Sequence, residues 1–194
     1  MQRQPPVGKF KLKLTQAFTL VEVMAVIAVI AILITLALPG IGGLSASANS
    51  EVYANALIGA LNQAKETAIQ NKRYVTMCAV NALTVTTTAN IVIPACVNNT
   101  TTWNSWVVYI DTALNSGTAT QLISLAGNMV SNSITTSSTG YLVFNSLGLV
   151  TLNGTATPIT PINFIVAAPG CRGNNGRQVT LSANGTIVVA KIGC

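Results

Sequence analysis

Residues 13–39 read KLTQAFTLVEVMAVIAVIAILITLALP, and this stretch decides how the rest of the chain can fold. Residues 18–38 form a run of 21 residues in which Glu22 is the only charged side chain. At about 1.5 Å per residue, an α-helix of this length matches a hydrocarbon core of roughly 30 Å. The stretch therefore predicts a membrane-spanning helix, and it raises the question of why that helix carries a glutamate near its start.

The charged residues are few and unevenly placed. The 194-residue chain has ten lysines and arginines and four acids, for a formal net charge of +6. Four of the cations precede the apolar run, namely Arg3, Lys9, Lys11 and Lys13. The remaining cations nearly balance the acids, so net charge gives little support for nucleic-acid binding. Because no further lysine or arginine occurs until Lys65, the pattern predicts a cytoplasmic N-terminus and a C-terminal part on the far side of the membrane.

The sequence contains few of the residue types that catalyse reactions. Histidine is absent, and the acids are Glu22, Glu51, Glu66 and Asp111. The sequence also lacks a nucleophile elbow and a phosphate-cradling glycine loop. We therefore expect a non-enzymatic protein with no cofactor and no metal.

Four cysteines, Cys78, Cys96, Cys171 and Cys194, occur without a CxxC pair. Because no histidine is available as a further ligand, two disulfides are a better interpretation than a zinc site, and they indicate an oxidising compartment. Of the three connectivities, we favour Cys78 with Cys96 and Cys171 with Cys194, since each closes a short local loop. Each bridge would add about 3 kcal/mol of stability. Free buried thiols are the alternative.

Two plain interpretations of the apolar run stand beside a more specific one. A secretory signal peptide would be cut near the SASA sequence at residues 45–48, but its apolar core would exceed the usual ~7 to 15 residues. A simple single-span anchor would leave Glu22 unpaired, at a cost of up to about 2.5–3.5 kcal/mol at mid-membrane.

The sequence AFTLVE at residues 17–22 resembles the class III signal of type IV pilins and type II secretion pseudopilins. In that family a short basic leader is removed just before a Phe-Thr-Leu-x-Glu sequence, and the new N-terminal phenylalanine is methylated. The resemblance implies a leader of residues 1–17, cleavage between Ala17 and Phe18, and N-methylation of Phe18. Ala17 departs from the glycine that usually precedes the cut.

The same resemblance gives Glu22 a role as the fifth residue of the mature chain. Its carboxylate would pair with the N-terminal amine of a neighbouring subunit when the helices bundle into a filament. Such pairing removes most of the cost of an acid among apolar helices and sets subunit register. The implied partners are other major and minor pilins, a prepilin peptidase and N-methyltransferase, and the inner membrane.

Beyond the apolar run the pattern changes twice. Residues 39–43, PGIGG, predict a kink or a melted stretch where the helix leaves the membrane. A helical pattern then resumes to about Asn71, with Leu57, Leu61, Ala64 and Ala68 on one face. This face predicts an amphipathic helix packed against a globular domain.

The remainder predicts strands, from short runs rich in β-branched residues. Tight turns are expected at the Asn-Gly pairs that begin at Asn153 and Asn184. The threonine-rich tracts at residues 86–88, 100–102 and 133–139 are interpreted as solvated loops and edges. The predicted strand runs are residues 74–80, 89–95, 105–111, 140–146, 149–154, 162–168, 177–183 and 185–192.

The predicted fold class is α+β: a type IV pilin fold with a long N-terminal helix, first transmembrane and then amphipathic, packed on an antiparallel β-sheet domain. Its parts are the leader (1–17), the transmembrane and assembly helix (18–39), the amphipathic continuation (40–72) and a periplasmic β-rich domain (73–194). Later landmarks resemble GspH/FimT/FimU-type minor pilins and pseudopilins. They are VTMC at 75–78, Cys96, WNSWVVYID at 103–111, FNSLG at 144–148 and GRQVTLSANGTIVV at 176–189.

Three functions follow from the resemblance. The first is a minor pilin near the tip of a type IV pilus, priming or capping assembly from the inner membrane. The second is a pseudopilin of a type II secretion system.

The third function is DNA binding for natural transformation, which some FimT-type proteins achieve through a Gly-Arg-x-Arg motif. The matching turn at residues 185–188 reads GTIV and lacks both arginines. Arg172, Arg177 and Lys191 remain as possible DNA contacts, but three phosphate contacts give weak, salt-sensitive binding. Solvated hairpin charges are therefore the favoured interpretation.

Overall fold

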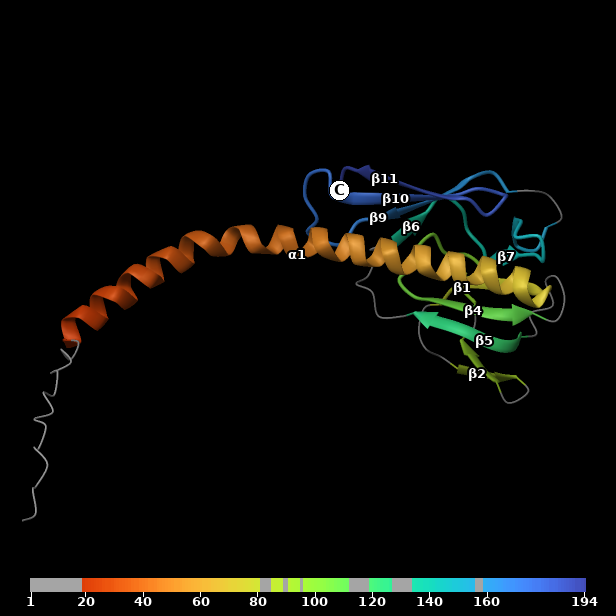
Figure 1. Ribbon diagram of the computed structural model, residues 1–194, viewed down its shortest axis with the longest axis horizontal. Coiled ribbons are helices and arrows are strands. Elements are labelled where there is room, and N and C mark those ends of the chain that lie inside the picture. Colours follow the sequence, from red (N-terminus) through yellow and green to blue (C-terminus); the bar gives the residue numbers. More distant parts are fainter. Residues whose placement is uncertain are drawn as a thin grey trace, which may run out of the picture. The chain divides into compact units, whose positions relative to one another are not determined.

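One long helix precedes eleven strands in the described part of the chain (Figure 1). The computed structural model describes residues 19–80, 85–88, 91–94, 96–111, 119–126, 134–155 and 159–194, without the side chains of residues 36–44, 85–94 and 119. The chain divides into two compact units, residues 1–40 and 41–194. Helix α1 (Leu20–Asn71) contributes to both units.

Of the two predictions for residues 39–43, the melted stretch is wrong, because α1 continues through it without a break, and the kink stays a prediction. A proline removes only one intrahelical hydrogen bond, while the residues on either side keep theirs, so the ladder can be carried past Pro39.

The helix ends at Asn71, one residue before the predicted limit. Lys72 adopts a left-handed conformation with φ 51°. The amide N–H of Arg73 then donates to the carbonyl of Ala68 at 3.2 Å. This bond closes the last turn as a Schellman motif and directs the chain into the first strand.

The strands form three antiparallel sheets. A five-stranded sheet has the order β5-β4-β1-β7-β8, a four-stranded sheet has the order β11-β10-β9-β6, and β2 pairs with β3. The strands are β1 (Tyr74–Ala79), β2 (Val85–Thr88), β3 (Ile91–Pro94), β4 (Trp106–Asp111), β5 (Ala119–Ala126), β6 (Ile134–Thr136), β7 (Leu142–Phe144), β8 (Val150–Leu152), β9 (Ile162–Val166), β10 (Gly176–Leu181) and β11 (Ile187–Ile192).

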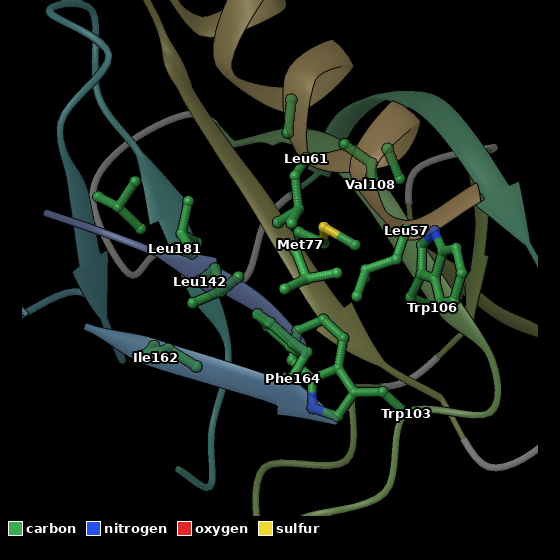
Figure 2. Close-up of a cluster of buried hydrophobic side chains, with 14 of the residues drawn as sticks. Leu57, Leu61, Met77, Trp103, Trp106, Val108, Leu142, Ile162, Phe164 and Leu181 are labelled. Atoms are coloured by element: carbon green, nitrogen blue, oxygen red, sulfur yellow. The ribbon is translucent and has the colours of Figure 1, made fainter. Parts of the chain in front are cut away.

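The main core lies where the second part of α1 packs against both larger sheets (Figure 2). Leu57 and Leu61 are fully buried, as are the alanines at the next two positions of the predicted face, Ala64 and Ala68. The predicted amphipathic face is therefore confirmed. Trp103 closes one end of the core, with its ring 5.3 Å from that of Phe164 in an edge-to-face arrangement.

A second, smaller cluster covers the opposite face of the five-stranded sheet. It contains Cys78, Val80, Val107 and Tyr109. The disulfide between Cys78 and Cys96 brings the chain after β3 onto this face, and the N–H of Val97 donates to the carbonyl of Ala79 at 2.9 Å. Strand β1 is consequently buried on both faces.

The last hairpin is fixed to the helix by one lysine. The Lys65 Nζ donates to the carbonyl oxygens of Gly185 at 3.0 Å and Asn184 at 3.3 Å. Gly185 has φ +69°, and a Cβ built there would lie 2.6 Å from the carbonyl oxygen of Gly148. The FNSLG turn, the Asn-Gly turn and α1 therefore meet too closely for any side chain at position 185.

The two Asn-Gly pairs form different turns. Asn153 and Gly154 both have positive φ, and the Thr155 N–H donates to the Leu152 carbonyl, which is a type I′ turn. In the last hairpin the turn residues are Ala183 and Asn184, and Gly185 follows as the bulge residue of a three-residue loop. Both pairs form tight turns, as predicted.

Three strands were not predicted as such: β2, β5 and β6. Strand β2 covers the whole tract at residues 86–88, and β6 lies inside the tract at 133–139. Both are edge strands, so the prediction of solvated loops and edges holds for edges and is wrong for loops, and for solvation at the buried Thr136. Threonine is β-branched and suits strands as well as loops, and composition alone does not separate the two.

Replacing Gly185 with alanine should lower the free energy of unfolding by about 2–4 kcal/mol. The left-handed conformation costs a non-glycine residue about 1–2 kcal/mol, and the added methyl group must also displace the Gly148 carbonyl or the Lys65 stem. Gly173→Ala is the matched control, since Gly173 also has φ +69° but has nothing within 4 Å of a Cβ. It should cost about 1–2 kcal/mol. Urea unfolding followed by fluorescence of the buried tryptophans measures both, and equal losses would contradict the close approach.

Stability should also fall steeply in alkali because of Tyr109. Burial, reinforced by the negative charge of Asp111, raises the pKa of Tyr109 to about 12. The unfolded chain ionises near pH 10, so between pH 10 and 12 it holds fewer protons than the folded chain and becomes favoured. We expect a loss of about 2–3 kcal/mol across that window, largely abolished by Tyr109→Phe. A tyrosinate absorbance titration showing every tyrosine ionising near pH 10, as in the denatured chain, would contradict this.

Candidate assembly site

Thr19 caps the start of α1, three residues before Glu22. The Thr19 Oγ1 accepts a hydrogen bond from the Glu22 N–H at 3.3 Å, and the Thr19 carbonyl also accepts from that N–H at 3.0 Å. This is the Ser/Thr-x-x-Glu spacing at which a side chain closes the first turn. Glu22 therefore lies in the first turn, where a carboxylate also interacts favourably with the helix dipole.

The helix that follows this cap exposes apolar side chains on all sides. The fractional exposure of its large apolar residues from position 20 to 34 ranges from 46% at Ile30 to 76% at Leu20. Soluble helices normally confine such residues to one stripe. A surface of this kind must be covered by lipid or by other apolar helices.

The predicted cleavage site lies outside the described residues. Both Ala17 and Phe18 precede Thr19, the first described residue. The leader removal and the methylation of Phe18 therefore stay predictions.

In the part of the chain that the structure describes, no helix is both long enough and apolar enough to cross a membrane.

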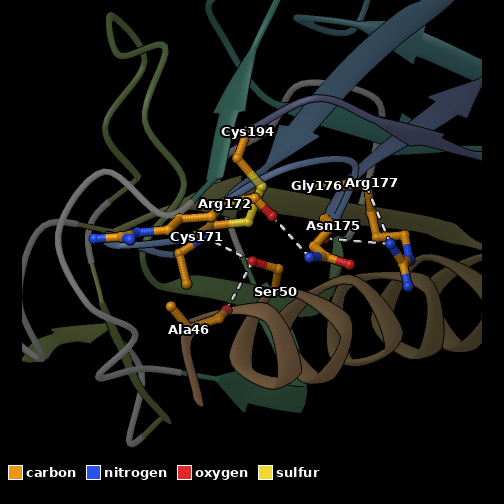
Figure 3. Close-up of a disulfide and its surroundings, with 9 residues drawn as sticks. Ala46, Ser50, Cys171, Arg172, Asn175, Gly176, Arg177 and Cys194 are labelled. Carbon is orange, nitrogen blue, oxygen red and sulfur yellow. Dashed lines mark hydrogen bonds between the residues drawn. A yellow bond between two sulfur atoms is a disulfide. The ribbon is translucent and has the colours of Figure 1, made fainter. Parts of the chain in front are cut away.

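The second disulfide lies beside α1 near residue 50 (Figure 3). Cys171 is bonded to Cys194, so the chain end is tied to the loop that follows β9, and both disulfides have the pairing that spacing favoured. In this loop the N–H of Ala168 donates to the Ser50 Oγ at 2.9 Å, and that hydroxyl donates to the Ala46 carbonyl at 3.0 Å. Ser50 is fully buried and links the loop directly to the helix.

The three cations that we considered as DNA contacts do not form one free cluster. The Arg177 guanidinium lies 3.3 Å from the Glu51 carboxylate and also donates to the carbonyls of Asn175 and Gly176. Lys191 is the direct register partner of Arg177 on the next strand, and Arg172 is exposed in the disulfide loop. One of the three charges is therefore already matched within the chain.

The described residues contain no group of three or more histidine, cysteine, aspartate or glutamate side chains that could hold a metal ion. The functional residues that sequence reasoning missed are Thr19, Ser50 and Lys65, which cap or link rather than react. The Thr-x-x-Glu spacing could have revealed the first, whereas the other two depend on long-range contacts.

Comparison with known families gives two matches. The family described as type II transport protein GspH matches residues 53–185, and the prokaryotic N-terminal methylation motif matches residues 12–38. No curated protein matches the chain.

The chain is similar to two crystal structures of the type IV minor pilin FimU from Pseudomonas aeruginosa PAO1. In one, the identity is 17% and the TM-score 0.48, with 72% of this chain and 91% of that chain covered. In the other, the identity is 16% and the TM-score 0.48, with 75% and 88% covered.

The GspH match spans well over half of the chain and includes every strand from β1 to β10, but not β11. The methylation motif includes the capped helix start and the exposed apolar run. The chain therefore belongs to the GspH family, with an α+β fold and the prokaryotic N-terminal methylation motif.

Proposed function

We propose that this protein is a minor pilin that primes or caps assembly of a type IV pilus from the inner membrane. The observation that carries the proposal is the exposed apolar helix of residues 20–34 with its single acid, Glu22, in the first turn. In this role the protein is structural and not catalytic.

The proposed sequence of events begins with insertion through residues 18–38, with the N-terminus in the cytoplasm and residues 73–194 in the periplasm. A prepilin peptidase removes residues 1–17, and Phe18 is methylated. The apolar helix then exchanges lipid for the helices of other pilins, where close packing and rare polar pairs decide which neighbours fit.

Glu22 supplies the polar pair in this scheme. Removal of the leader frees the amine of Phe18, four residues before Glu22. In a bundle of such helices, this amine would lie close to the Glu22 carboxylate of a neighbouring subunit. Pairing the carboxylate of one subunit with the amine of the next satisfies both charges in a low-dielectric bundle. Its place in the first turn gives a competing explanation, in which the Glu22 charge only stabilises its own helix through the helix dipole, at roughly 0.3–1 kcal/mol.

Glu22→Gln separates these two explanations. Glutamine keeps the size and hydrogen-bonding capacity of glutamate but loses its charge, so a role in the helix dipole alone would cost only about 0.3–1 kcal/mol. We expect leader removal to continue but incorporation into filaments to fall at least about a hundredfold, because breaking a buried pair costs about 3–5 kcal/mol. The measurement is the ratio of this protein in sheared filaments to that in membranes of the native host.

Glu51→Gln is the control, since it removes a carboxylate that is exposed and engaged with Arg177 in the globular unit. It should leave incorporation unchanged. If the Glu22→Gln variant enters filaments at the wild-type level, Glu22 only stabilises its own helix and the assembly role is wrong.

A pseudopilin of a type II secretion system is the second candidate, favoured by the description of the matching family as a type II transport protein. Both candidates share every step above. Deleting the gene distinguishes them: loss of surface pili with normal exoprotein secretion supports the pilus, and the reverse supports the secretion system.

DNA binding is not proposed. Two of the three candidate cations, Lys191 and Arg172, are left without an acid in the described residues, and two phosphate contacts would give weak binding that salt readily abolishes.

A further inference from the structure

Three of the four edge strands of the larger sheets are covered within the chain. At β6, the Trp103 N–H donates to the Ile134 carbonyl at 2.9 Å and the Thr136 N–H donates to the Thr101 carbonyl at 2.8 Å. At β8, the Val150 N–H donates to the Ala183 carbonyl at 2.8 Å. Strand β5 pairs with β4 through two register irregularities and has β3 beside it.

Strand β11 is the fourth edge, and no described residue covers it (Figure 1). The Ser182 N–H donates to the Thr186 carbonyl at 3.0 Å. This bond shows which alternate residues of β11 form backbone hydrogen bonds with β10. Residues 188, 190 and 192 therefore direct their backbone groups toward β10. The N–H and C=O groups of Ile187, Val189 and Lys191 point to the open side.

Of the devices that usually protect an edge, β11 has only a lysine near its end, Lys191. Its register with β10 is unbroken over six residue pairs, and it contains neither a proline nor a bulge. Val188 and Val189 lie on opposite faces and are 55% and 46% exposed. A regular apolar edge of this length is a template for another strand, and soluble proteins avoid leaving one open.

The direction of β11 limits which occupant fits. Its start lies beside Lys65, through the bond to Gly185, and its end lies at the level of Glu51, through the Arg177 pair. Strand β11 therefore runs opposite to this part of α1. Two copies paired symmetrically through β11 would point the packed parts of their helices in opposite directions, unlike the proposed filament, in which the helices of all subunits bundle in one direction.

The charge at the end of the edge indicates the chemistry of the occupant. Lys191 lies directly opposite Arg177, and like charges in that position destabilise a strand pair. Glu51 matches Arg177, and among the described residues no acid forms an ion pair with Lys191. A carboxylate on an added strand beside Lys191 would supply the opposite charge that Lys191 lacks.

We propose that β11 is a strand-addition site for an extended segment of a different pilin-like subunit, with alternating apolar residues and a carboxylate at the level of Lys191. This inference rests on the proposed function, because it takes the helices of all subunits to bundle in one direction. The added strand continues the four-stranded sheet and forms hydrogen bonds with the outward N–H and C=O groups of Ile187, Val189 and Lys191.

Hydrogen exchange with single-residue resolution tests the site in the full chain, comparing protein from membranes with protein in sheared filaments. The amides of Ile187, Val189 and Lys191 should exchange at least about tenfold more slowly in filaments, whereas those of Val188 and Ala190 should change little because β10 already binds them. Unchanged exchange at the three odd-numbered residues would overturn the proposal.

Val189→Pro removes one outward N–H without touching a bond to β10, and Val189→Thr is the control that keeps this N–H. The proline variant should fall at least about tenfold in filaments with normal leader removal and tryptophan fluorescence, and the threonine variant should not. Normal incorporation of a folded proline variant would overturn the site. If the proline variant misfolds, Lys191→Glu replaces it. We expect a smaller loss of incorporation into filaments, because the new carboxylate repels that of the added strand. Normal incorporation of this variant would count against the site.

Two further outcomes identify where an error lies. If wild-type protein and the threonine variant also fail to enter filaments after leader removal, the proposed function is wrong and not the edge alone. If Val189→Cys forms a disulfide-linked homodimer in membranes, a second copy occupies the edge, and the proposed occupant is wrong.

Discussion

Burial of one face of α1 against both larger sheets is the interaction on which the rest of the structure depends. Leu57 and Leu61 share one core with residues of both sheets, which the aromatic pair of Trp103 and Phe164 and the hydrogen bond from Val150 to Ala183 also connect. Fully burying a leucine contributes about 1.5–3 kcal/mol, and the alanines at 64 and 68 allow close approach of the backbone. Residues 54–68 of α1 thereby become part of the core of the globular unit.

The contacts at the two ends of that packed segment have different consequences. Near residue 50, the buried Ser50 hydroxyl and the Cys171–Cys194 loop tie the helix to the end of the chain. Near residue 65, Lys65 holds the last hairpin by its turn carbonyls. The hairpin is therefore fixed at both ends relative to α1, and its outer strand is presented as a regular, straight edge. The exposed apolar helix and this edge are the surfaces that the chain leaves for other molecules.

The helix and the site of the acid could be predicted because their signals are local. The spacing of Leu57, Leu61, Ala64 and Ala68 follows the helical period, and the Phe-Thr-Leu-x-Glu sequence is contiguous. Continuity of α1 through Pro39 could not be predicted, since proline and three glycines favour a break when read alone. Strand β6 was missed because its short threonine-rich sequence also suits a loop. That β11 is an open edge could not be predicted either. Whether an edge strand is covered depends on contacts with distant segments, which no local sequence pattern indicates.

The central claim is that this chain acts as a processed pilin, with Glu22 placed near a free N-terminal amine. The most direct test is the intact mass and N-terminal sequence of the protein recovered from membranes of its native host, before and after reduction. The account predicts a chain that begins at a methylated Phe18 and gains the mass of four hydrogens when its two disulfides are reduced. A chain that still carries residues 1–17, or one that begins at Asn49, would contradict it.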